Sequence, residues 1–263
     1  MYIAYLSRSL KYVSVCNYLS AVRFLHASLG YDIDCLSSFT VTATIKGYKR
    51  LMGSPNTQKL PLSYDMLCDI ISSCDSSSES GYMACILVGF FAFLRKANLC
   101  PNSVAQFNTQ FHLSRGAIKF TDYGALISVF GSKVIQFKEK VLEIPLIKHT
   151  SASSVCPVTA LKKHFDRFPA PAHSPAFLRD NGQAITHRNI SEFLKKKLKL
   201  LGIEEDTISM HSLRREGATY AHSKGAPLEM IQVMGDWASM SVLLYLSRPL
   251  DKRIAVAKLL SDR

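Results

Sequence analysis

The residues best suited to chemistry lie near the carboxyl end of this sequence, between His211 and Tyr245. His211 and Arg214 stand three residues apart, so on a helix both side chains emerge from one face. An imidazole transfers protons, and a guanidinium fork fits phosphate oxygens. Trp237 follows 26 residues after His211, and Tyr245, whose hydroxyl could act as a nucleophile, follows eight residues later. This set favours chemistry on a phosphate group.

Short helices must hold these residues in place. Ser209 or His211 is suited to cap the first helix, where unpaired backbone N–H groups and the helix dipole also favour an anion. Gly225 suits the carboxyl end of that helix, Pro227 suits the first turn of the next, and Gly235 suits its end. We therefore expect two consecutive helices, separated by a turn, ahead of the tryptophan.

The segment HSLRREGATYAHSKGAPLEMIQVMGDWASMSVLLY resembles the tyrosine recombinases, the phage-integrase family. The family signature is His-x-x-Arg, then a Trp or His, then the nucleophilic Tyr, matched here by His211, Arg214, Trp237 and Tyr245. Taken alone, a late Tyr is usually a packing or surface residue and a lone Trp usually belongs to a core. The resemblance implies that Tyr245 forms a 3′-phosphotyrosyl intermediate, and that no metal, ATP or other cofactor is needed.

A second candidate guanidinium is Arg95. From Gly81 onward apolar residues recur at helical spacing, and they predict a buried helix that ends at Arg95. The stretch GFFAFLRKANLCP resembles the family's first arginine motif, in the form found in eukaryotic transposon-encoded members such as cryptons. Asn98 stands where many bacterial members have an acidic residue, so a possible carboxylate partner is lost, although an amide still accepts a hydrogen bond. The alternative is that Arg95 caps the helix or extends to the surface.

Strand signals follow between residues 116 and 146. Alternation and turn chemistry predict a hairpin of residues 116–120 and 125–130 around the turn 121–124. A third strand is predicted over 141–146, where Pro145 favours an edge position. The resembled family carries a catalytic lysine at the turn between the second and third strands. That position matches Lys133, the candidate general acid; Lys138 and Lys140 are the competing choices.

Residues 1–55 indicate a separate helical domain, with helices over 2–10, 13–29 and 41–52. The second helix has apolar residues at helical spacing, which predict a wide face packed inside a small bundle; they are Val15, Tyr18, Leu19, Val22, Leu25 and Leu29. The segment VCNYLSAVRFLHASLG resembles the core-binding domain that clamps DNA in this family. It is short for such a domain, so the alternative is that the family's first helix is missing. Residues 53–59, which are polar and contain Pro55, predict the linker to a catalytic domain of residues 59–263.

Charge favours a polyanionic partner. Lys and Arg outnumber Asp and Glu by 32 to 20, which gives a net charge of +12 and a pI near 9.4. Double-stranded DNA is the partner that fits this charge together with phosphate chemistry. Two basic groups are candidate DNA contacts, with a solvated surface as the alternative for each: Arg23, Lys46, Lys49 and Arg50, and, on a helix that Thr186 is expected to cap, Lys195, Lys196, Lys197 and Lys199.

Composition bounds the class of protein. A hydrophobic content of 48% and a mean hydropathy of +0.08 indicate a globular chain. No apolar run reaches the roughly 18 residues that a membrane span requires. No signal peptide is visible, so we expect an intracellular protein, nuclear if the host is eukaryotic. Seven scattered cysteines without a Cys-x-x-Cys pair predict reduced thiols and no metal site.

The expected fold is mainly α-helical with one small antiparallel β-sheet, a tyrosine recombinase catalytic domain preceded by a short helical domain. The expected function is site-specific DNA recombination or integration for a transposable element. The alternatives are a type IB topoisomerase-like enzyme and a domesticated DNA-binding protein that no longer cuts.

The last residues predict a final helix. It opens at Pro249 and carries an apolar stripe made of Leu250, Ile254, Ala257 and Leu260. The resemblance implies that this helix docks on a neighbouring protomer, in a homo-oligomer expected to be a tetramer on DNA. The alternative is that it folds back on its own domain.

Overall fold

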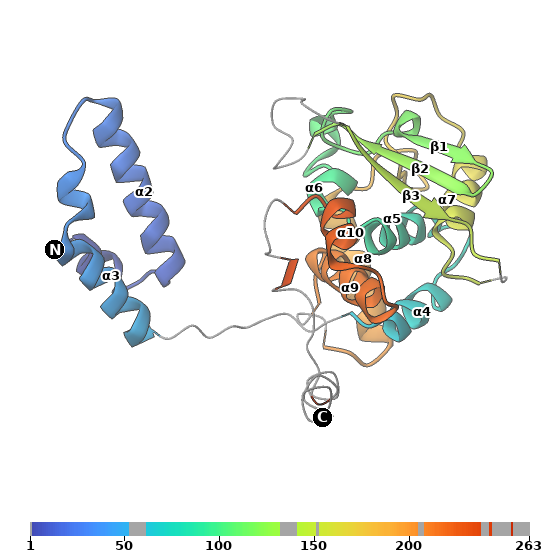
Figure 1. The fold of residues 1–263 in the computed structure, drawn as a ribbon. Coiled ribbons are helices and arrows are strands. Elements are labelled where there is room, and N and C mark those ends of the chain that lie inside the picture. Colours follow the sequence, from blue (N-terminus) through green and yellow to red (C-terminus); the bar gives the residue numbers. More distant parts are fainter. Residues whose placement is uncertain are drawn as a thin grey trace. The chain divides into compact units, whose positions relative to one another are not determined.

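The computed structural model describes residues 2–52, 62–131, 141–150, 153–204, 208–237, 242–243 and 254. The chain divides into two compact units, Met1–Gln58 and Lys59–Arg263, and each is described by itself (Figure 1). Within the described residues the architecture is mostly helical with one three-stranded antiparallel sheet, which confirms the expected fold class. The predicted linker, residues 53–59, lies outside the described residues.

The first unit is built from short helices: α1 Tyr2–Leu6, α2 Tyr12–Ser28, the 3-10 turn η1 Asp34–Ser37, and α3 Phe39–Met52. The first helix ends earlier than the predicted span 2–10. Beyond it, the Tyr48 hydroxyl of α3 lies within hydrogen-bonding distance of the carbonyls of Ser7 and Leu10 and holds the chain in a turn. Tyr48 therefore ties α1 to α3.

The apolar face of α2 is only partly covered. Val15 and Leu19 are buried in the small core of this unit. Tyr18, Leu25 and Leu29 are half or more exposed. The prediction that this face packs inside a small bundle therefore holds for Val15 and Leu19 and not for the other three, because α1 and α3 provide too little surface to cover a wide stripe on α2.

The second unit has seven α-helices within its described residues: α4 Tyr64–Ser72, α5 Ser80–Phe91, α6 Lys96–Leu99, α7 Pro157–Arg167, α8 His187–Leu200, α9 Met210–Ser223 and α10 Leu228–Met234. The caps predicted at Thr186 and Ser209 hold, since each forms a capping box. A third cap is Ser63, whose side chain accepts the Met66 N–H at 3.2 Å. These local bonds explain why the helices begin where the sequence predicts.

The central helix of this unit is α5, which packs against α7 and α9 (Figure 1). Gly217 of α9 makes the crossing close, since a Cβ there would lie 2.0 Å from the carbonyl oxygen of Phe90. Helix α9 carries His211 and Arg214, and the chain that leaves α5 carries Arg95. The α5–α9 contact therefore sets the spacing of the candidate site residues.

The sheet has the order β1-β2-β3, with strands Ile118–Thr121, Gly124–Val129 and Leu142–Ile147. The first two form the predicted hairpin. Gly124 is required at its turn, because its φ is +150° and a Cβ would lie 2.2 Å from the carbonyl oxygen of Leu146. Pro145 lies on the outer strand opposite Leu126, which confirms its edge position.

Candidate active site

Arg95 follows a sharp change of chain direction after α5. Phe93 adopts φ +50°, and Arg95 stands immediately before α6. A bulky residue at positive φ is strained, and it persists where the surrounding structure enforces it. The Arg95 side chain keeps 23% of its surface exposed. Its Nη1 donates to Asp236 Oδ2 at 3.0 Å, and its Nη2 donates to the Asp236 carbonyl oxygen at 2.6 Å.

Arg214 is held more deeply, on α9, with only 4% of its surface exposed. Its Nη1 donates to the carbonyl oxygen of Phe93 and its Nη2 to that of Gly235. The Trp237 ring covers the guanidinium, with Cζ 3.9 Å from the ring centroid. A cation over the face of an indole is stabilised electrostatically. Trp237 therefore holds Arg214 through its ring.

His211 lies in the first turn of α9, and its side chain is exposed. Partial desolvation of its ring lowers its pKa, and the charges of Arg214, Arg215, Lys96 and Arg95 lower that pKa further. The imidazole is therefore neutral near pH 7 and able to accept a proton. Four cations around one imidazole also produce a positive potential that favours an anion.

A turn after α10, which we call the acidic turn, consists of Gly235, Asp236 and Trp237. Between them these three residues contact the guanidiniums of Arg95 and Arg214. Gly235 and Trp237 contact Arg214, and Asp236 binds Arg95. Asp236 adopts φ +51° and is 6% exposed. Each arginine therefore bridges the loop after α5 and the acidic turn after α10.

Asn98, which was considered as a hydrogen-bond acceptor for Arg95, uses its side-chain amide as a donor to two backbone carbonyls. Its Nδ2 donates to the carbonyl oxygens of Phe111 and Gly131, at 3.1 Å and 2.7 Å. Asn98 thus fixes the end of β2 against α6. The carboxylate partner of Arg95, which the sequence appeared to lack, is supplied by Asp236.

Asp236 is the site residue that sequence reasoning missed. The available signal was an acidic residue between Gly235 and Trp237, in the segment that leads to Tyr245. Aspartate also tolerates the left-handed conformation that a tight turn requires. Nothing local indicates that its partner stands 141 residues earlier in the chain.

The structure brings four predicted catalytic residues together: Arg95, His211, Arg214 and Trp237. Lys133 and Tyr245 lie outside the described residues, as do Lys138 and Lys140, the competing choices for the lysine. The gathered set supplies two guanidiniums for phosphate oxygens and one neutral imidazole for a proton. That combination suits a charged phosphoryl transition state.

The basic residues of the first unit differ in their surroundings. Lys46, Lys49 and Arg50 are exposed on α3. Arg23 is partly buried, and its Nη2 donates to the carbonyl oxygen of Leu36 at 2.6 Å. Arg23 therefore holds η1 against α2, and the three α3 residues are the accessible candidates for phosphate contact.

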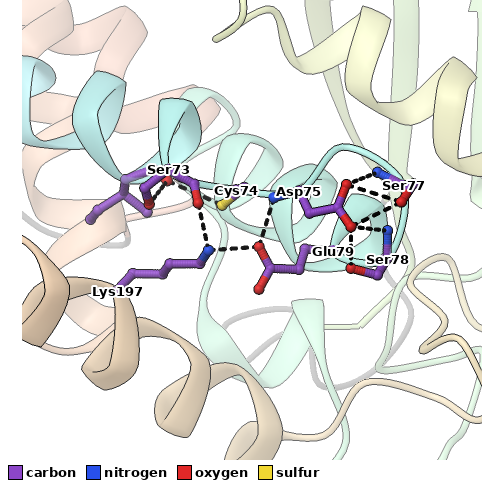
Figure 2. Close-up of polar contacts among 8 residues, drawn as sticks. Ser73, Cys74, Asp75, Ser77, Ser78, Glu79 and Lys197 are labelled. Atoms are coloured by element: carbon purple, nitrogen blue, oxygen red, sulfur yellow. Dashed lines mark hydrogen bonds and ion pairs between the residues drawn. The ribbon is translucent and has the colours of Figure 1, made fainter.

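One lysine of the α8 run is structural. Lys197 is 4% exposed, and its Nζ donates to Glu79 Oε2 at 2.6 Å and to the carbonyl oxygen of Ser73 at 2.8 Å (Figure 2). The prediction that Lys197 contacts DNA is therefore corrected, because its charge is used inside the fold. The exposed lysines of this run are Lys195, Lys196 and Lys199.

The serine loop, residues 73–79, carries both acceptors of the Lys197 ammonium, Glu79 Oε2 and the Ser73 carbonyl oxygen (Figure 2). The Asp75 carboxylate accepts bonds from the backbone N–H and hydroxyl groups of both Ser77 and Ser78. These bonds hold the Asp75 pKa well below its usual range. The Asp75 N–H donates to Glu79 Oε2 at 2.9 Å, so the loop places the carboxylate that receives Lys197.

All seven cysteines are free thiols. In the part of the chain that the structure describes, no group of three or more His, Cys, Asp or Glu side chains is placed to hold a metal ion. Nor do the described helices include one long and apolar enough to cross a membrane.

The fold is that of the tyrosine recombinases. The chain aligns with the XerA recombinase at 17% identity and a TM-score of 0.57, over 97% of this chain and 85% of that one. It aligns with the Tn1549 transposon integrase in complex with transposon right end DNA at 15% identity and a TM-score of 0.65, over 98% and 83%. A lambda integrase dimer bound to a core site aligns at 15% identity and a TM-score of 0.54, over 96% and 75%.

Residues 132–246 match the phage integrase family. No curated protein sequence matches the chain significantly. The matched range includes the positions of Lys133, His211, Arg214, Trp237 and Tyr245. The chain therefore has the tyrosine recombinase fold, and its residues 132–246 are similar to the phage integrase family.

Proposed function

We propose that this protein is a site-specific DNA recombinase, which cleaves and rejoins DNA through a covalent 3′-phosphotyrosyl intermediate. One observation carries the proposal: two loops from distant parts of the chain hold Arg95 and Arg214 beside a neutral His211. The family match and the fold support the same reaction.

Each side chain has a defined task in this reaction. The Tyr245 oxygen attacks the phosphorus, and its proton passes to His211. Arg95 and Arg214 neutralise the charge that grows on the nonbridging oxygens. The bond to the 5′ oxygen breaks, and Lys133 supplies the proton that this oxygen needs. Rejoining reverses the step with a second 5′ hydroxyl, so the energy of the phosphodiester bond is kept.

The test is a nicked suicide substrate scored for protein covalently joined to DNA. The unmodified protein should form the adduct, and Tyr245→Phe should form none while binding DNA with similar affinity. Tyr220→Phe is the matched control, because the Tyr220 ring stacks on Tyr64 at 4.4 Å and lies roughly 14 Å along α9 from His211. An adduct with Tyr245→Phe would transfer the role to another tyrosine.

DNA binding should rest on phosphate contacts from the exposed basic residues of both units. The affinity should fall with salt at roughly −0.9 per phosphate neutralised in a log–log plot. Replacing Lys195, Lys196 and Lys199 by Gln should flatten that slope. A slope near −1 for the unmodified protein would contradict a two-unit clamp, and a normal slope in the triple variant would exclude the α8 lysines.

We propose further that the final segment joins protomers in a tetramer on DNA. The second unit has an open apolar groove of about 480 Å³ along α5, α9 and α10, lined by residues that include Phe90, Phe91, Tyr220, Met230 and Met234. The proposed occupant is the C-terminal stripe of a neighbouring protomer. Of that stripe, Ile254 is described; it is helical and 46% exposed.

Assembly is tested by gel shift on DNA with one and with two sites. Met230→Lys and deletion of residues 250–263 should both spare single-site binding and abolish pairing of two sites. Ile147→Lys is the matched control, since Ile147 is 60% exposed on β3 and does not line the groove. Loss of folded protein on deletion would indicate that the segment packs on its own protomer.

The form of the first arginine motif supports an origin in a crypton-like mobile element of a eukaryote, and hence a nuclear site of action. Two rival functions remain open to experiment. Relaxation of a supercoiled plasmid that lacks a target site would favour a topoisomerase-like enzyme. Specific DNA binding without any covalent adduct would favour a domesticated binding protein.

A further inference from the structure

The acidic turn has a property that the proposed reaction does not itself require. Asp236 contacts Arg95 twice, through its carboxylate at 3.0 Å and through its carbonyl oxygen at 2.6 Å. The two bonds run to different nitrogens, so they fix the plane of the guanidinium as well as its position. They engage two of its five N–H donors.

The side chains of Asp236 and Arg95 differ in how much of their surface is exposed. The Asp236 side chain is 3% exposed, whereas the Arg95 side chain is 23% exposed. The carboxylate is therefore enclosed by protein, and part of the guanidinium remains open to an incoming group. An arginine held in this manner loses little conformational freedom when it binds a phosphate.

The backbone conformation of Asp236 is also unusual. Asp236 stands at φ +51°, and Phe93, on the opposite loop, stands at φ +50°. The conformation is costly for the bulky Phe93 and is better tolerated by aspartate, and strain of the kind at Phe93 concentrates at functional sites. The carbonyl of each of these residues accepts a bond from one of the two arginines.

We propose that Asp236 is a positioning residue, which holds the Arg95 guanidinium in the orientation that the transition state needs. The inference rests on the proposed function. The acidic turn begins ten residues before Tyr245, so the same segment that leads to the nucleophile also sets the arginine.

The decisive variant is Asp236→Asn, because asparagine also tolerates the left-handed conformation and preserves the carbonyl contact. The single-turnover rate of adduct formation on nicked DNA should fall roughly 10- to 100-fold, as expected for a misplaced catalytic group. The Kd for DNA should stay within about twofold of the unmodified protein, since phosphate contacts elsewhere dominate it. Glu192→Gln is the matched control, because it removes a carboxylate from an exposed ion pair with Arg188.

A double-variant cycle separates positioning from general stability. Arg95→Lys and Asp236→Asn should each slow cleavage, and the double variant should be little slower than Arg95→Lys alone, because Arg95→Lys already removes the planar fork that Asp236 orients. Multiplicative losses would overturn the inference. So would an unchanged or faster rate in Asp236→Asn, the latter because it would make Asp236 a competitor of the phosphate.

The positioning role of Asp236 and the proposed function are overturned by different results. Adduct formation by the unmodified protein at the same rate as by Asp236→Asn overturns the positioning role and leaves the proposed function intact. Absence of adduct with the unmodified protein overturns the proposed function, and the positioning role with it.

Discussion

Arg95 and Lys197, both in the second unit, are each bound by one carboxylate and one backbone carbonyl. The two ion pairs differ in which partner is exposed. At Arg95 the carboxylate of Asp236 is 3% exposed and the cation is 23% exposed. In the serine loop the order is reversed: Lys197 is 4% exposed and Glu79 is 18% exposed (Figure 2). Both pairs join segments far apart in the sequence.

For these two carboxylate pairs, the reversal separates a structural cation from one that a ligand can still reach. A buried cation must be compensated entirely within the protein, and Lys197 is compensated by Glu79 and Ser73. A cation that remains partly exposed, over an enclosed carboxylate, can still receive a phosphate. Side-chain chemistry alone would not distinguish the two places, since each combines a cation, an acid and a carbonyl.

The largest expected effect is on catalysis at Arg95. Arg95→Lys keeps a positive charge beside Asp236 but loses the planar fork. Cleavage should fall by about 10² to 10³, on the order of 3 to 4 kcal/mol in the barrier, as when one transition-state donor is removed. The measurement is the single-turnover rate of adduct formation, with thermal unfolding as a check that the fold is retained.

Arg95→Ala is a poorer test of the same idea. It would leave the enclosed Asp236 carboxylate without its arginine, so stability would fall together with activity. If Arg95→Lys cleaved DNA at the normal rate, the comparison would fail, because Arg95 would then be as structural as Lys197.

The next effect concerns stability at Lys197. Lys197→Met keeps the length of the side chain and removes the charge, so Glu79 loses its cation and the Ser73 carbonyl loses its donor. The free energy of unfolding should fall on the order of 3 kcal/mol. Urea unfolding measures it, and adding Glu79→Gln should recover part of the loss. Cleavage per folded molecule should be unchanged; a selective loss of cleavage would place Lys197 in the active site.

A third buried group, His164, shows what happens without a carboxylate partner. It is fully buried, its Nε2 accepts the Leu178 N–H at 3.1 Å, and its Nδ1 lies 3.1 Å from the Ser80 hydroxyl. Burial, with a further contribution from Arg115, lowers the pKa of His164 to about 4. This histidine is therefore neutral in the folded protein.

The consequence for pH dependence has a definite sign. Between about pH 6.5 and pH 4 the unfolded chain binds a proton that folded His164 does not, so stability falls as pH falls through this range. The full contribution, about 3 kcal/mol, is present above pH 6.5. Urea unfolding from pH 7 to pH 4.5 measures it. His164→Gln should be less stable at pH 7 and should lose less stability on acidification; parallel pH profiles for the two proteins would refute this account.

Local patterns predicted most of the fold. The caps at Thr186 and Ser209 and the edge position of Pro145 depend on neighbours in the sequence or on one residue's own chemistry. The extent of burial on α2 was wrong because periodicity identifies an apolar face and does not reveal how many elements cover it. Leu25 and Leu29 illustrate this, since both fit the helical pattern and both are exposed.

The candidate site was predictable where a resemblance supplied it and not where tertiary contacts decide it. His211 and Arg214 share one helix face by spacing alone. The contact of Asp236 with Arg95 spans 141 residues, and that of Lys197 with Ser73 spans 124. Neither can be read from local sequence, so one site residue was missed and one structural lysine was assigned to DNA.

The smallest expected effect belongs to an ion pair with neither partner buried. Arg188 Nε lies 2.7 Å from Glu192 Oε1 on α8, with side chains 84% and 59% exposed. Water screens both charges, and an arginine on the amino-terminal side of a glutamate is the less favourable order on a helix. Glu192→Gln should therefore shift the unfolding midpoint by less than about 1 °C.

Differential scanning calorimetry of Glu192→Gln and Lys197→Met under the same conditions compares the two shifts in unfolding midpoint directly. Equal shifts in the two variants would mean that ion pairing, rather than burial of the cation, determines what each pair contributes, and the distinction drawn between Arg95 and Lys197 would lose its physical basis.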